Sequence, residues 1–195
     1  MLREVLKACA ISGCLSFAMT GVAAQEVVHA FGGIVSEVNP RAKTITVIPG
    51  DRPQSQNIFK GIPDFKYSAL LDKKISDGAV AVDTVKEKGL YVIVYYLSDG
   101  KLLNAIALRN LGPGPFTEAV GTFVKFENRG RSILIKDKSG APQSFQFNPD
   151  TIAETSNGVV AGSKFQPEKG DLVRVMTMEA NGTATALFID GCFVD

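Results

Sequence analysis

Residues 33–38, Gly33-Ile34-Val35-Ser36-Glu37-Val38, decide the fold of this chain, because their pattern returns at residues 121–126, Gly121-Thr122-Phe123-Val124-Lys125-Phe126. The two stretches begin 88 positions apart, and the segments that follow, residues 44–47 and 132–135, keep that offset. A Pro-Gln-Ser triplet then follows in each half. Two copies of one module account for this spacing.

Each copy has the pattern of β structure. Ile45 and Val47 alternate with polar residues, as in a half-buried strand, and Ile133 and Ile135 hold the matching positions of the second copy. In the strand before, the apolar residues Val35 and Val38 stand three positions apart instead of two, which predicts a bulge. Gly-containing pairs such as Asn181-Gly182 are typical of hairpin turns.

These features predict an all-β protein of two tandem small barrels, each of about five strands with a short helix or loop insertion. The expected organisation is a signal peptide over residues 1–24, a first barrel over 25–110, a Gly/Pro linker over 111–117 and a second barrel over 118–195. The insertion of the first copy contains a candidate helix at residues 65–75. Each module holds roughly 80 residues, which is enough for one small core.

The N-terminus has the features of an exported chain. Arg3 and Lys7 precede a short apolar stretch, and Val22-Ala23-Ala24 places small residues before a polar segment, which predicts cleavage after Ala24. An alternative is that Ile11-Ser12-Gly13-Cys14 serves as a lipobox, so that Cys14 is acylated and anchors the protein in a membrane. We therefore expect a periplasmic or secreted protein, with a lipoprotein as the alternative.

The charge and the cysteine content limit the kinds of binding partner that this chain can have. Cleavage removes two of the 21 basic and one of the 20 acidic side chains, which leaves 19 of each. A nucleic-acid binder normally carries a basic surplus, so we expect no nucleic-acid partner. Only Cys192 would remain after cleavage, which excludes an internal disulfide and leaves either burial or a disulfide between two chains.

The pattern resembles the secreted bacterial OB-like small β-barrel domain family of unknown function. The resemblance rests on Gly33, Val35 and Val38, and on a Gly-Asp-x-Val-x-Val entry to the fourth strand at residues 170–175. The first copy lacks the aspartate of that entry after Gly89. The resemblance implies an OB-like fold for each barrel, and because its motifs are structural glycines and core valines, it implies no activity.

The residues give little sign of catalysis. His29 is the only histidine, and it stands near the expected mature terminus, where we expect it to be exposed. Several aspartates fall in loops, but no spacing selects two of them as a general acid and base, so a hydrolase with carboxylate catalysis ranks third among the possible functions. We expect no enzyme and no cofactor.

Met176 and Met178 are weak candidates for a metal site. Thioethers at i and i+2 lie on one face of a strand and can hold Cu(I), and the Met-Thr-Met run distantly resembles that of periplasmic OB-barrel metal carriers. Those carriers also use a tryptophan, which this chain lacks. A periplasmic soft-metal (copper) carrier is therefore the second function, and packing is the favoured role of both methionines.

Tyr91, Ile93 and Tyr95 form the predicted binding surface. If Val92 and Val94 point into the first barrel, these three side chains point outward as an apolar face, which must be covered. The favoured cover is the second barrel, and the alternative is another envelope protein or an extended ligand. The sequence as a whole predicts an exported, non-catalytic binding or scaffolding module of the bacterial envelope.

Overall fold

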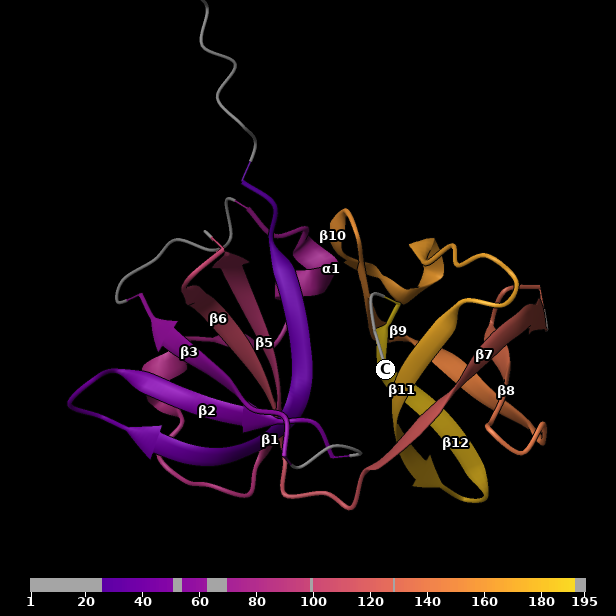
Figure 1. Ribbon diagram of the computed structural model, residues 1–195, viewed down its shortest axis with the longest axis horizontal. Helices are drawn as coiled ribbons and strands as arrows, with labels where there is room; N and C mark the ends of the chain where they lie inside the picture. The colour runs from indigo at the N-terminus through magenta and orange to yellow at the C-terminus, as the bar shows by residue number, and fades with distance from the viewer. Residues whose placement is uncertain (1–25, 51–53, 63–69, 99, 128, 192–195) are drawn as a thin grey trace, which may run out of the picture.

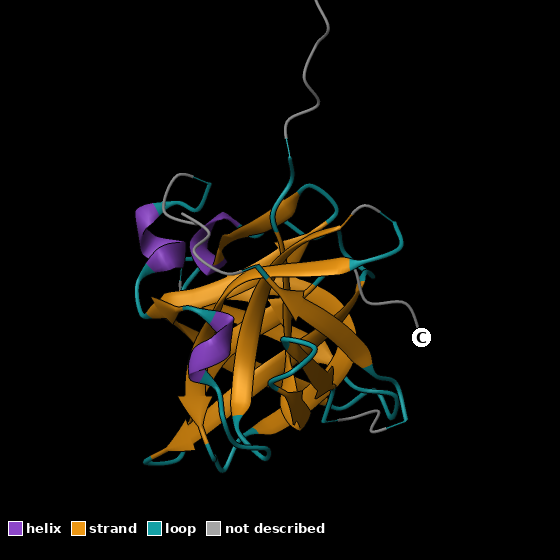
Figure 2. Ribbon diagram, turned by 90° about the vertical axis from the view of Figure 1, so that its left-hand side faces the viewer, coloured by secondary structure: helices purple, strands orange, loops and turns teal. Residues whose placement is uncertain are grey.

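The computed structural model describes residues 26–50, 54–62, 70–98, 100–127 and 129–191. Two strand-built units lie side by side, barrel 1 from the N-terminal half and barrel 2 from the C-terminal half (Figure 1). The few helices are short and lie outside the strands (Figure 2). The protein is all-β, with two OB-like barrels as the sequence predicted.

Barrel 1 is a closed ring of five strands. Its strands are β1 (His29–Asn39), β2 (Thr44–Ile48), β3 (Asn57–Gly61), β5 (Tyr91–Ser98) and β6 (Leu103–Gly112). Neighbours pair antiparallel in the order β3-β2-β1-β5-β6, and a parallel pairing of β3 with β6 closes the ring. Between β3 and β5 lie the short helix α1 (Lys73–Ser76), the small edge strand β4 (Ala79–Val80) and the 3-10 turn η2 (Val82–Thr84).

Barrel 2 closes in the same way. Its ring consists of β7 (Thr117–Glu127), β8 (Ser132–Lys136), β9 (Pro142–Thr155), β11 (Leu172–Ala180) and β12 (Thr183–Asp190). The parallel pairing here joins β9 to β12. The edge strand β10 (Gly158–Ala161) and the 3-10 turn η3 (Gly162–Lys164) stand where barrel 1 has β4 and η2.

The predicted bulge is confirmed in both barrels. The register of β1 against β2 shifts between Val35 and Glu37, and that of β7 against β8 shifts between Phe123 and Lys125. A bulge bends the first strand, so that it pairs with two neighbours and the small ring can close.

A glycine precedes each bulge because the backbone approaches there. A side chain on Gly33 would collide with the carbonyl oxygen of Ile48, and one on Gly121 would collide with that of Lys136. Only a residue without a Cβ fits at such a contact. The two glycines that open the repeated pattern are therefore required by barrel closure.

The described residues form three apolar cores instead of two. One fills barrel 1 and includes Val92 and Val94, and one fills barrel 2 and includes Val173 and Val175. The third core lies between the barrels and takes side chains from both, Ile93 and Tyr95 from barrel 1 with Met176 and Phe188 from barrel 2 among them. We call the contact region around this third core the seam.

The connection between the barrels is shorter than the predicted linker. Strand β6 continues through Gly112, which pairs with Tyr91, and β7 begins at Thr117. The predicted linker residues 111 and 112 therefore belong to a strand, because a glycine at φ +92° still allows the last pairing of β6.

The helix predicted at residues 65–75 can be checked against the structure only from residue 70 onward, since residues 63–69 lie outside the described ranges. In the described part, α1 covers only Lys73–Ser76, with Asp72 as its N-cap. The Asp72 side chain accepts a hydrogen bond from the backbone N–H of Lys74 at 3.0 Å, which fixes where the helix begins.

Candidate functional site

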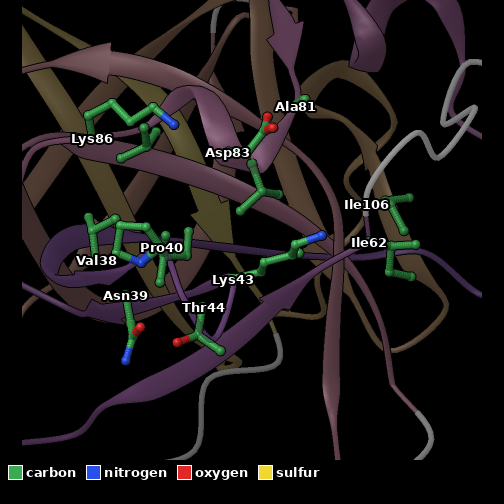
Figure 3. A pocket seen from close by; sticks show the side chains of 14 residues that line it. Val38, Asn39, Pro40, Lys43, Thr44, Ile62, Ala81, Asp83, Lys86 and Ile106 are labelled. Atoms are coloured by element: carbon green, nitrogen blue, oxygen red, sulfur yellow. The ribbon is translucent and has the colours of Figure 1, made fainter.

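A groove crosses one end of barrel 1, between the β1–β2 hairpin and the segment around η2. Its volume is about 400 Å³. Figure 3 shows the lining side chains, with Pro40 and Thr44 on the hairpin side and Ala81 and Asp83 on the η2 side. We call this the barrel 1 groove.

The floor of the groove is apolar and rigid. Ile45, Val82 and Val85 line it and also belong to the core of barrel 1, each with less than a tenth of its surface exposed. Ile62 and Ile106 continue the apolar lining toward the other end. Because the same residues pack the barrel, the floor of the groove is preformed.

Short-range hydrogen bonds hold both walls. On the hairpin side, the Asn39 side-chain oxygen accepts from the backbone N–H of Ala42 at 3.0 Å, and Lys43 takes a left-handed backbone conformation with φ 55°. On the η2 side, the Thr84 hydroxyl donates to the carbonyl of Ala81 at 2.6 Å. These bonds fix the two turns that carry the charged rim.

Three charged side chains form that rim. Lys43 extends from the hairpin wall, and Lys86 and Asp83 extend from the η2 wall (Figure 3). Asp83 is the only carboxylate among the described lining residues, which include neither histidine nor cysteine. The groove therefore offers an apolar floor with a rim that carries one net positive charge. Such a site can enclose an apolar group and contact an anion.

The seam contains a buried acid that the sequence reasoning did not select. The Glu154 carboxylate on β9 lies 2.6 Å from His29 Nδ1, and its other oxygen accepts the Ala30 backbone N–H at 2.7 Å. Burial raises the pKa of Glu154 to about 7, against the lowering effect of the hydrogen bonds from His29 and Ala30. Glu154 thus ties barrel 2 to the first strand of barrel 1.

The expectation that His29 is an exposed terminal residue is wrong. His29 begins β1, pairs with Tyr96 of β5 and is half-buried against barrel 2. Its side-chain partner, Glu154, lies 125 positions further along the chain, so no local sequence pattern indicates this contact.

A second buried charge lies on β11. Arg174 is 3% exposed, and its guanidinium lies 3.0 Å from the Asp190 carboxylate and 3.7 Å from that of Glu118. It also lies over the Phe31 ring of barrel 1 at 5.3 Å. The arginine is buried with two acidic partners, as burial of a guanidinium requires, so we assign it a structural role at the seam.

Tyr91, Ile93 and Tyr95 point away from the interior of barrel 1, but not toward solvent. Ile93 and Tyr95 are fully buried in the third core, and the Tyr95 hydroxyl donates to the Ile75 carbonyl at 3.0 Å. Tyr91 is partly buried and packs edge-on against Phe116. Barrel 2 covers this face, as the favoured interpretation expected, and the alternative of an external partner or ligand on Ile93 and Tyr95 is corrected.

The two candidate metal ligands lie in different surroundings. Met176 is 2% exposed and packs in the third core, whereas Met178 is 39% exposed. The register shift in the pairing with β12 places the extra residue, Leu187, on β12, so β11 keeps its alternation and only the surroundings of the two methionines differ. Within the described ranges, no three His, Cys, Asp or Glu side chains are grouped to hold a metal ion.

Cys14, Cys192 and the predicted signal peptide over residues 1–24 all lie outside the described residues. Lipidation at Cys14 and a disulfide between two chains at Cys192 therefore stay predictions. Within the described ranges, no helix has the length and apolar character needed to span a bilayer.

Solved structures of the metal-binding protein CusF are similar to part of the chain. Silver-bound CusF matches 39% of this chain and 96% of its own length at 13% identity, with a TM-score of 0.29. A copper(II)-bound CusF variant from Escherichia coli matches 40% of this chain and 92% of its own, at 14% identity and a TM-score of 0.31. Apo-CusF from the same organism matches 40% of this chain and 88% of its own at 13% identity, with a TM-score of 0.30. No protein-family model matches the chain, and no curated protein matches it significantly.

Proposed function

We propose that this protein is an exported, non-catalytic binding module of the bacterial envelope and that it holds its ligand in the barrel 1 groove. The observation that carries the proposal is the groove itself, a preformed cavity of about 400 Å³ with an apolar floor and a few polar groups at its rim. Cavities of roughly 300–1,000 Å³ with this composition are typical of small-molecule sites.

The chemistry of the groove favours binding over catalysis. A hydrolytic site needs a base beside a nucleophile, or two carboxylates of different pKa. The described lining supplies one hydroxyl, from Thr44, and one carboxylate, from Asp83, with no histidine. His29 is engaged with Glu154 in the seam, outside the groove.

The remainder of the molecule is suited to a supporting role. Barrel 2 covers the outer face of β5 and buries the apolar residues that a single barrel would expose. The described lining residues of the groove all come from barrel 1. Export is supported by the leader-like N-terminus, and the envelope is therefore the proposed location.

The test is recovery of a bound compound from the protein made in its natural compartment. The chain with its own leader is expressed in a bacterium, purified from the envelope fraction without denaturant and analysed by native mass spectrometry. We expect a bound small molecule on the wild-type chain. It should be lost from Thr44→Trp and Ala81→Trp, because each places an indole in the groove from an opposite wall.

Glu37→Trp is the matched control, because Glu37 is exposed on β1 and does not line the groove. Circular dichroism identifies any variant that fails to fold. If either Thr44→Trp or Ala81→Trp does not fold, the other still tests the proposal. A wild-type chain free of ligand, or equal ligand on Glu37→Trp and both groove variants, would contradict the proposal.

A further inference from the structure

We propose that the ligand of the barrel 1 groove is a small apolar molecule that bears an anionic group, such as a medium-chain carboxylate. This inference rests on the proposed function and adds the chemical class of the ligand. It follows from the floor, the rim and the size of the groove.

The floor selects for an apolar body. Ile45, Val82 and Val85 present their side chains to the groove, and Val38 and Ile62 extend this surface along it. A bound apolar chain would remove this surface from water, which is the main favourable term for small ligands in such sites. A fully polar ligand would not form apolar contacts with the floor.

The rim selects for an anion. Lys43 and Lys86 line the groove from opposite walls, and both residues are exposed. Either ammonium group can contact a carboxylate at the end of an apolar body, and an ion pair beside an apolar surface is screened less by water.

Asp83 opposes the anion and makes the inference testable in both directions. Its carboxylate belongs to the same wall as Lys86, so it repels an anionic ligand and lowers the net rim charge to one positive. Removing this charge should strengthen binding of an anion, whereas removing either lysine should weaken it. A purely structural role of these exposed side chains predicts neither change.

The size of the groove points to a small molecule instead of a protein partner. Its volume of about 400 Å³ lies within the range of roughly 300–1,000 Å³ that is typical of small-molecule sites. An acyl chain of medium length with its head group fits such a volume. Octanoate is therefore a suitable probe.

The experiment is isothermal titration calorimetry of the full mature chain with octanoate, octanol and octylamine. We expect octanoate to bind more tightly than octanol, and octanol more tightly than octylamine. Each of Lys43→Gln and Lys86→Gln should weaken octanoate binding by up to about fivefold, as for partly exposed ion pairs. Asp83→Asn should strengthen it, and the control Lys136→Gln on barrel 2 should leave it unchanged.

The outcomes separate this inference from the proposed function. Equal binding of octanoate and octanol, lost in Ala81→Trp, would leave the groove as the ligand site and overturn the anionic class. Octanoate binding that Lys43→Gln, Lys86→Gln and Asp83→Asn leave unaltered would overturn it as well. If none of the three probes binds but a ligand is recovered from the envelope, the proposed ligand class would be wrong and the groove would remain the proposed ligand site.

Discussion

At the scale of the residue, Glu154 shows how one side chain joins the two barrels. Its two carboxylate oxygens contact the side chain and the backbone of consecutive residues, His29 and Ala30, at the start of β1. The charged groups that face it from its neighbours are His29 on β1 and Asp190 on β12, and Asp190 is in turn bound to Arg174. Burial dominates this balance and raises the pKa of Glu154 to about 7.

This pKa predicts a stability that falls as the pH rises. Because the folded-state pKa of about 7 lies above the ordinary value of 4.5, the folded chain holds the proton more tightly than the unfolded chain. The contribution of Glu154 to stability is therefore complete below about pH 4.5 and is lost as the pH rises through 7. The expected loss is on the order of 3 kcal/mol, which urea unfolding at several pH values measures.

Glu154→Gln is the informative variant because it removes the titrating group and keeps the shape. The wild-type chain should lose stability relative to this variant between pH 4.5 and 7. The control Glu168→Gln, at an exposed position, should follow the wild type. A wild-type chain that instead gains stability relative to Glu154→Gln over this range would show that folding lowers the pKa of Glu154.

At the scale of the element, the strands follow from local patterns. The three-residue spacing of Val35 and Val38 predicted the bulge, and the structure places a register shift between Val35 and Glu37. The turn predicted at Asn181-Gly182 is also present, with positive φ at both residues. Bulges and tight turns depend on a few neighbouring residues, so a single sequence is enough to predict them.

The candidate site was not predicted, because it depends on distant elements. The groove combines the β1–β2 hairpin with the η2 segment, roughly forty residues later, and no motif links Lys43 to Lys86. The Glu154–His29 contact spans an even longer separation. The outward direction of Ile93 and Tyr95 was predicted by strand alternation, but alternation alone left open what covers them.

At the scale of the whole molecule, the third core makes the two barrels one folding unit. Phe188 is 1% exposed in this core, and it lies so close to β1 that a side chain on Gly32 would meet its ring at 2.6 Å. Backbone contacts add to the apolar packing, since the Val159 N–H donates to the Val28 carbonyl at 2.8 Å. The barrels should therefore unfold together.

Phe188→Ala tests this coupling. Truncation of a fully buried phenylalanine costs about 3–5 kcal/mol, and here the loss falls on the contact between the barrels. We expect a lower free energy of unfolding and a division of the single wild-type transition into two, measured by calorimetry. Leu102→Ala, at a side chain 51% exposed, should change stability by less than about 0.5 kcal/mol. Equal effects of the two variants would show that the seam does not couple the barrels.

The central claim is that the ligand site of this two-barrel protein is the barrel 1 groove. Backbone amide chemical shifts of the full mature chain, recorded by NMR during a titration with octanoate, test it most directly. The account predicts that the largest saturable shift changes fall on groove residues such as Val38, Thr44 and Val85, while barrel 2 is unaffected. Changes centred on Ile93 and Met176 at the seam, or on barrel 2, would contradict it.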